Sequence, residues 1–455
     1  MMRKGLWVLC CCLAVVISFG LTPMTGCSNN GGTEATGEST QEEKTVTENA
    51  AEATKDQSGD ETTSGTDESN DGSTTAEDGP EPTKEDGPEG PAFEPNPNVG
   101  KIRWSTSVQG EVKSIAIAPD QSVIYVAARG LSALDPTNGN EVWSLGTLGE
   151  QISAPVVDGK GMIYVSSKTK LLYAIDPKTK KTAWNAQLLT EGHLFPPALG
   201  KDGLVLVANG NALQAFKAPG TSAWSANYVL SGKVSSAPSV GLDGTIYLCS
   251  DDKTLHAIKP SGEKLWEKVL GGNEPCTAVS VDADGTVYAG GSKLNAYKSD
   301  GTVKWAPKSK YGVVTTAVVL HDSFLYFGTF RGKLFKVRKS DGEPANLLWK
   351  SGTTISVNDE LRYAPTVGAG GLVYIGSVDS SNPEIQFINP TRGKVERSFG
   401  GREPFSGHPA IAKDGTMFVG TTGGTIIALW TDSPGLANSP WPRGLRNNQN
   451  TSYLK

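Results

Sequence analysis

"IYVAARGLSALDPTNGNEVW" (residues 124–143) returns in altered form as "IYVSSKTKLLYAIDPKTKKTAW" (residues 163–184). Six further copies follow at a period of about forty residues, and the last, "MFVGTTGGTIIALW" (residues 417–430), stops early. A period of this length indicates a repeat architecture, in which each copy buries its apolar face against its neighbours. The repeat therefore decides the fold class.

Each copy contains four short alternating segments separated by turn signals. In the second copy these are "SAPVV" (153–157), "MIYVS" (162–166), "LLYAID" (171–176) and "TAWNAQ" (182–187). No segment carries a helical apolar period over ten or more residues. Four antiparallel strands per copy are typical of a β-propeller blade, so we predict an all-β, eight-bladed propeller.

A tryptophan recurs at the start of the fourth segment of most copies. We expect it to pack each outer strand onto a neighbouring blade, because a large aromatic ring at a fixed place buries roughly 150 to 250 Å². This role is structural rather than ligand-binding. The blade-docking residues are Trp104, Trp143, Trp184, Trp224, Trp266, Trp305 and Trp349.

The first of these tryptophans precedes the first full copy. "GKIRW" (100–104) has a glycine four residues before its tryptophan, and the incomplete eighth copy lacks that pair. We therefore expect this N-terminal strand to be the outer strand of blade eight. Pairing of the two ends closes the ring and removes an open sheet edge.

The motif "ALDPTNGNEVW" (133–143) resembles the tryptophan-docking motif of the quinoprotein-type, or PQQ-like, β-propellers. The tail "WPRGLRNNQNT" (441–451) is similar to a segment that often flanks these propellers. The resemblance covers about residues 100 to 455 and implies the propeller fold. It does not imply one activity, because the family includes enzymes and scaffolds.

The N-terminus resembles a bacterial lipoprotein signal peptide, residues 1–26. Arg3 and Lys4 precede an apolar run at 5–21, and "MTGC" resembles a lipobox ending at Cys27, the residue that would be acylated. An ordinary export signal is the alternative. Residues 27–98 are rich in Glu, Asp, Ser, Thr, Gly and Pro and predict a disordered acidic tether, and residues 99–455 predict the propeller.

Charge and cysteine content differ between these parts. The stretch from Ser28 to Val99 carries a net −16 and the propeller region a net +8, which the overall value of −6 conceals. Only Cys249 and Cys276 fall in the propeller region. An exported compartment permits a disulfide between them, but we favour two separate buried thiols.

The enzymatic alternative is a PQQ-dependent dehydrogenase of the periplasm. Resemblance to that branch would imply PQQ with calcium, a carboxylate set, a catalytic aspartate and a disulfide between adjacent cysteines. The propeller region has no adjacent cysteines, and its four histidines, at 193, 256, 321 and 408, lack metal-site spacing. We therefore expect no catalytic residues, no metal and no cofactor.

With an enzymatic role set aside, we expect a binding surface. It lies on the face that carries the connections between second and third strands and the connections between blades. Cations recur there and would attract anionic partners, although a solvated rim without a partner is the alternative. The candidate binding residues are Arg129, Lys168, Lys170, Lys253, Lys293, Arg331, Lys333, Arg362 and Tyr363.

These features predict a non-catalytic, lipid-anchored cell-envelope propeller that scaffolds proteins or an anionic polymer. It resembles the lipid-anchored propellers of the outer-membrane barrel-assembly machinery, which makes outer-membrane protein assembly one specific instance. We expect a monomer held at the membrane by the lipid on Cys27, with no nucleic-acid partner. The outer membrane, on its periplasmic or surface side, is favoured over the inner membrane.

Overall fold

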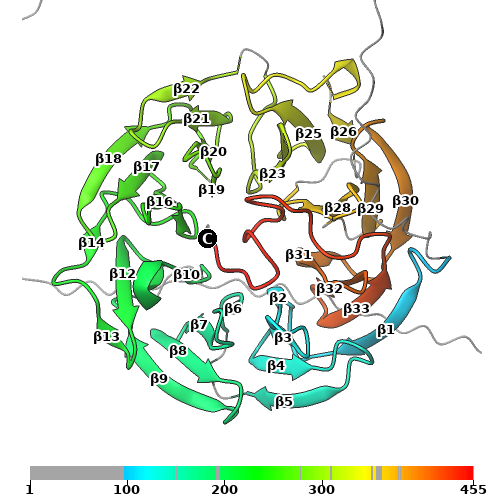
Figure 1. Ribbon diagram of the computed structural model, residues 1–455, viewed down its shortest axis with the longest axis horizontal. Helices are drawn as coiled ribbons and strands as arrows, with labels where there is room; N and C mark the ends of the chain where they lie inside the picture. The colour runs from blue at the N-terminus through cyan, green and yellow to red at the C-terminus, as the bar shows by residue number, and fades with distance from the viewer. Residues whose placement is uncertain are drawn as a thin grey trace, which may run out of the picture. The chain divides into compact units, whose positions relative to one another are not determined.

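Eight antiparallel sheets follow one another around a central axis in the computed structural model (Figure 1). The structure describes residues 97–453, except 147, 150, 191–194, 277, 308–309, 350–351, 355–360, 378 and 380. The predicted signal peptide, Cys27 and the acidic tether up to residue 96 lie outside the described residues. In the part that is described, no helix has the length and apolar character needed to cross a membrane.

Blades one to four follow each other along the chain from the inner to the outer strand. Blade one is β2 (Ser114–Ile117), β3 (Ile124–Ala127), β4 (Leu131–Leu134) and β5 (Glu141–Leu145). Blade two is β6 (Val156–Val157), β7 (Ile163–Ser167), β8 (Leu171–Asp176) and β9 (Lys181–Gln187). Blade three is β10 (Ala198–Leu199), the 3-10 turn η1 (Lys201–Gly203), β11 (Val205–Asn209), β12 (Ala212–Lys217), β13 (Thr221–Ser222) and β14 (Tyr228–Val229). Blade four is β15 (Ser239–Val240), β16 (Ile246–Cys249), β17 (Thr254–Ile258) and β18 (Lys264–Val269).

Blades five to eight complete the ring. Blade five is β19 (Val279–Val281), β20 (Val287–Ala289), β21 (Asn295–Tyr297) and β22 (Val303–Trp305). Blade six is β23 (Val319–His321), β24 (Phe324–Gly328), β25 (Lys333–Arg338), the 3-10 turn η2 (Leu347–Trp349) and β26 (Thr353–Thr354). Blade seven is β27 (Thr366–Val367), β28 (Val373–Gly376), β29 (Glu384–Asn389) and β30 (Lys394–Gly400). Blade eight is β31 (Phe405–Ile411), β32 (Thr416–Thr421), β33 (Thr425–Trp430) and β1 (Ile102–Ser107).

The last blade confirms the predicted ring closed by the N-terminal strand. β1 pairs antiparallel with β33, with Trp104 opposite Ala428 (Figure 1). Arg103 reinforces the seam, because its guanidinium lies 2.6 Å from Asp414 and 4.6 Å from the centre of the Trp430 ring. The two ends of the ring are thus joined by a full strand pairing and by side-chain contacts.

Most of the docking tryptophans contact the hairpin between the third and fourth strands of the next blade. Trp104 donates from Nε1 to the carbonyl of Pro136 at 2.9 Å, and its ring covers Gly139. A Cβ at Gly139 would lie 2.5 Å from that ring, and its φ of +77° also favours glycine. The same donation to the next hairpin occurs at Trp224, Trp266, Trp305 and Trp349.

Blade seven has an arginine in place of the docking tryptophan. Arg397 stands opposite Phe387, as Trp143 stands opposite Ala133 in blade one. Its Nη1 donates to the carbonyl of Val99, and its side chain covers Gly100, where a Cβ would lie 3.0 Å from Cδ. Arg397 therefore docks blade seven onto the residues that lead into β1, in the way the tryptophans dock other blades.

The C-terminal segment, residues 441–453, crosses the centre of the ring (red in Figure 1). Its backbone carbonyls accept hydrogen bonds from inner strands of six blades, at Ile117, Val157, Leu199, Val240, Leu320 and Val367. Arg443 is fully buried there and donates to the carbonyls of His408 and Asn447 and to Asn450 Oδ1. This segment therefore links the inner strands of six blades at the centre of the ring.

The two cysteines of the propeller are bonded to each other. Cys249 ends β16, Cys276 lies in the connection between β18 and β19, and their Cα atoms are 5.6 Å apart. The interpretation as two separate thiols was wrong. The end of a second strand and the connection into the next blade lie at the same face, so residues 27 positions apart in sequence become neighbours.

Candidate functional site

All nine candidate binding residues belong to connections on one face of the ring, which we call the loop face. These connections join second to third strands and one blade to the next. Arg129 follows β3, Lys168 and Lys170 follow β7, Lys253 follows β16, Lys293 follows β20, Arg331 follows β24, Lys333 begins β25, and Arg362 and Tyr363 precede β27. They do not form one cluster, because only Arg129, Lys168 and Tyr363 line the two cavities of this face described below.

The first cavity, which we call the cup, lies at the central mouth of the loop face and has a volume of about 750 Å³. Three lysines line it, and one carboxylate, Glu111, forms an ion pair with Lys113. The Nζ atoms of Lys168 and Lys233 have no hydrogen-bond or ion-pair partner among the described residues. The cup therefore has an excess of positive charge.

The floor of the cup is formed by His408 and by Leu445 of the C-terminal segment. His408 Nδ1 accepts the backbone N–H of Ala364 at 3.1 Å, so the proton of the neutral ring is on Nε2. Burial, and then the charge of Arg443, lower the pKa of His408 to about 3. His408 as a whole is half-buried and lines the cup.

Arg443 adds a positive charge close beneath this floor. It is fully buried, no carboxylate lies within 4 Å of it among the described residues, and its Nε has no hydrogen-bond partner there. Burial lowers the pKa of Arg443 to about 9, which leaves the guanidinium charged at neutral pH. A charge in this poorly solvated place raises the potential of the cup above it.

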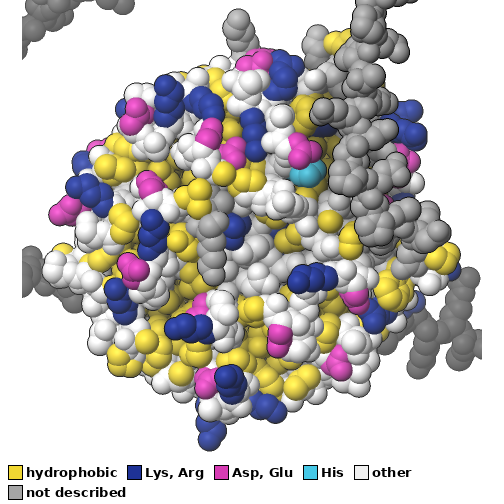
Figure 2. Space-filling view, viewed as in Figure 1, with side chains coloured by type: hydrophobic (Ala, Val, Ile, Leu, Met, Phe, Trp, Pro, Cys, Tyr) yellow, Lys and Arg dark blue, Asp and Glu magenta, His cyan; other side chains and the backbone are white. Residues whose placement is uncertain are grey.

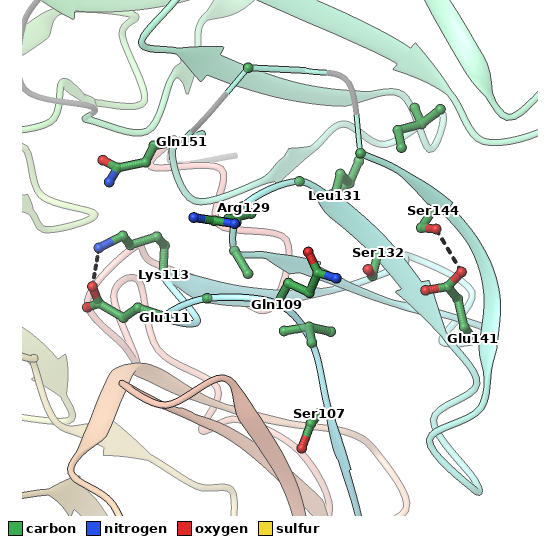
Figure 3. Close-up of a pocket in the computed structure, with 17 residues that line it drawn as sticks. Ser107, Gln109, Glu111, Lys113, Arg129, Leu131, Ser132, Glu141, Ser144 and Gln151 are labelled. Carbon is green, nitrogen blue, oxygen red and sulfur yellow. Dashed lines mark hydrogen bonds and ion pairs between the residues drawn. The ribbon is translucent and has the colours of Figure 1, made fainter.

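The second cavity, which we call the groove, has a volume of about 1120 Å³ and shares Glu111, Lys113 and Gln151 with the cup. Figure 3 shows Arg129 projecting into its middle, between Gln109 and Gln151. One end holds the Glu111–Lys113 ion pair, and the other holds Glu141, which accepts a hydrogen bond from Ser144 at 2.7 Å. The groove and the cup thus adjoin each other beside blade one.

Sequence reasoning missed most of the cup. Glu111, Gln151 and Lys233 each directly precede a buried aliphatic residue that leads into a blade, namely Val112, Ile152 or Val234. This shared column was a usable signal in the repeat. It was overlooked because its members have different charges.

In the described part of the chain, the remaining histidines do not form a metal site. His256 is buried and contacts Ser250 Oγ at 2.9 Å and Tyr228 OH at 3.2 Å, and His321 lies beside Asp322. His193 lies outside the described residues. No group of three or more His, Cys, Asp or Glu side chains among the described residues could hold a metal ion.

The described residues of the cup do not fit PQQ with calcium. Calcium requires several oxygen ligands, whereas the one carboxylate of the cup is already paired with Lys113. The Cys249–Cys276 disulfide joins residues far apart in sequence rather than adjacent ones. The donor set therefore suits the binding of anionic groups rather than a quinone and its metal.

Charge on the face shown in Figure 2 is mixed. Lys and Arg side chains are interspersed with Asp and Glu side chains around this view, and apolar side chains lie between them. This view has no region of one sign that would by itself mark a binding surface. The case for a site therefore depends on the two cavities and their lining residues.

The comparison of this sequence with protein families agrees with the propeller architecture. The profile of the family described as outer membrane protein assembly factor BamB (PQQ_2) matches residues 90–151 and 127–351, more than half of the chain. The chain belongs to this family. A curated relative, the outer membrane protein assembly factor BamB of Moranella endobia (strain PCIT), is 28% identical over 193 residues. That match covers 36% of this chain and 49% of the relative, so the chain spans about half of the relative's length.

Solved structures support the fold alone. BamB from Moraxella catarrhalis superposes with a TM-score of 0.57 at 15% identity, over 72% of this chain and 98% of that chain. The computationally designed protein Ika8 superposes with a TM-score of 0.60 at 13% identity, over 72% of this chain and 99% of that chain. A natural and a designed propeller thus share this architecture.

Proposed function

We propose that this BamB-family chain is a non-catalytic, lipid-anchored scaffold of the cell envelope that binds a protein partner through its loop face during outer-membrane protein assembly. The observation that carries the proposal is the groove and the cup, two adjoining open cavities on the loop face, of which the cup is lined in part by Leu445 of the C-terminal segment. The names of the curated relative and of the Moraxella catarrhalis structure support the assembly role. No cofactor and no nucleic acid take part, and the chain acts as a monomer.

The test of partner binding is affinity capture from detergent-solubilised envelope with the full-length chain carrying a C-terminal tag. We expect proteins of the outer-membrane assembly machinery to be recovered. Recovery of an anionic polymer without protein, or of nothing at low salt, would contradict the proposal. Quinone reconstitution is a separate control, in which no turnover of alcohols or glucose with added PQQ and calcium is expected.

Membrane attachment is tested separately through Cys27. Palmitate labelling of growing cells should mark the wild-type chain and should be lost in Cys27→Ser. Label that persists in Cys27→Ser would rule out this anchor.

A further inference from the structure

We infer that the groove and the cup together bind an extended acidic peptide segment of the protein partner. The inference rests on the proposed function, because it names the chemistry of the protein that the loop face would hold. Its basis is the shape of the combined cavity and the order of polar groups along its walls. An extended segment can follow the groove across blade one and end in the cup.

The cup supplies the strongest attraction for a carboxylate. Lys168 and Lys233 are exposed at its wall, and among the described residues neither has a side-chain partner and no carboxylate lies within 4 Å of the buried Arg443. His408 also lines the cup, and its Nε2 has no hydrogen-bond partner among the described residues. An acidic side chain seated here would accept hydrogen bonds from these donors while Phe195 covers its aliphatic stem.

The groove has the donors and acceptors that a peptide backbone needs. The side-chain amides of Gln109 and Gln151 are exposed and have no hydrogen-bond partner among the described residues. Each amide offers a carbonyl oxygen and an NH₂ group, which can pair with a backbone N–H and a backbone C=O. Arg129 lies between them, and its guanidinium, which has no partner in the described part of the chain, could bind a second acidic side chain.

The two carboxylates of the groove decide between a peptide and a polyanion. Glu141 lies toward one end of the groove and Glu111, paired with Lys113, toward the other, so a ligand with closely spaced charges would be repelled most strongly at Glu141. A polyphosphate or a sulfated polysaccharide would place negative charge beside both carboxylates. A peptide with separated acidic residues can place its charges at Arg129 and in the cup instead.

Fluorescence anisotropy with the full-length chain tests this inference. The probe is a short fluorescein-labelled peptide in which glutamate and serine alternate, and a peptide with glutamine in place of glutamate is its matched control. We expect the glutamate peptide to bind and the affinity to fall with added salt. Heparin and inorganic polyphosphate are tested as competitors.

Two variants separate the cup from the general charge of the loop face. Lys168→Glu/Lys233→Glu should weaken peptide binding by about tenfold, whereas Lys253→Glu/Lys293→Glu, on the same face but outside both cavities, should change it less than about twofold. Equal weakening by the two pairs would overturn the inference, because it would assign binding to diffuse charge.

A charge-neutral block tests the groove. A side chain at Gly146 would point into open space, since a Cβ there meets nothing within 4 Å, so Gly146→Phe fills the groove without disturbing the blade. Gly400→Phe is the control, since Gly400 is equally open and lies outside both cavities. Gly146→Phe should weaken the peptide by about tenfold, and an unchanged affinity would overturn the inference.

Failure of the acidic-peptide inference can be distinguished from failure of the proposed function. If the cup and groove variants still capture envelope assembly proteins as the wild type does, the scaffold role is supported and the acidic-peptide site is contradicted. If heparin or polyphosphate displaces the peptide and binds more tightly than it, the cavity serves a polyanion and the inference is overturned.

Discussion

The Trp104→Ala variant should destabilise the ring at its seam. Trp104 is 9% exposed, donates to Pro136 and packs against Phe418 with ring centroids 5.7 Å apart. Burial of roughly 150 to 250 Å² at about 25 cal/mol per Å² gives about 4 to 6 kcal/mol as an upper estimate. Large-to-small substitutions of buried aromatic residues cost about 3 to 5 kcal/mol. We therefore expect a loss of about 4 kcal/mol.

Thermal unfolding followed by circular dichroism measures this loss. The unfolding entropy is about 2.1 cal/mol/K per residue, so a ring of roughly 350 residues should melt about 5 °C lower for 4 kcal/mol. Trp143→Ala is the matched control within the ring, because Trp143 is only half-buried and its Nε1 has no hydrogen-bond partner among the described residues. Its melting temperature should fall by about half as much.

A second variant tests the same contact from the other side. Gly139→Ala places a Cβ 2.5 Å from the Trp104 ring and forces alanine to a φ of +77°. In the Trp104→Ala background the clash is gone and only the backbone strain remains, so the two losses should not add. Strict additivity, or a Trp104→Ala melting temperature within 1 °C of the wild type, would refute the docking argument. Deletion of residues 28–97 should leave the melting temperature unchanged.

Three further outcomes follow from the structure. Replacing both Cys249 and Cys276 with alanine should cost about 3.5 kcal/mol, the loop-closure value for 27 residues, in urea unfolding, and the variant should no longer respond to a reductant. Arg397→Trp should raise the melting temperature by about 1 °C, because it restores the docking residue that the other blades use, and a lower value would show that Val99 requires the guanidinium. His408 has a folded-state pKa of about 3, below its unfolded value, so the wild type should lose stability as pH falls below about 6.5. Between pH 7 and pH 5 this loss should be about 1 to 2 kcal/mol larger than in His408→Gln, and equal losses in urea titrations would contradict it.

The fold could be predicted from the sequence because several independent features of the repeat indicate the same blade. Alternating strands, positive-φ hairpins and a tryptophan at a fixed place all point to the same unit, and even the half-copy at Gly100 and Trp104 identified the closing strand. The docking role of Arg397 could not be predicted in this way. Its position in the repeat was visible, but an arginine does not resemble a tryptophan, and only the hydrogen bond to Val99 reveals the shared role.

The candidate site was much harder to predict. Cations on the loop face could be assigned from the turn positions, but the curvature of the ring decides which of them meet. Lys168 reaches the cup, whereas Lys253 and Lys293 line neither cavity. The disulfide was mispredicted for a similar reason. The number of residues between two cysteines says little about their distance in space across a blade boundary.

Ring closure and the proposed binding site are parts of one structure. The chain leaves β1 at Ser107 and runs directly along the groove through Gln109 and Glu111 to Lys113 at the edge of the cup. At the other end of the chain, Leu445 supplies part of the cup's floor. The segment after β1 lines the groove at the seam, and the C-terminal segment lines the cup at the centre of the ring. Both ends of the propeller therefore contribute to the site. A partner bound in the groove would hold the closing strand in place, so binding should slow separation of β1 from β33, the pairing on which the ring depends.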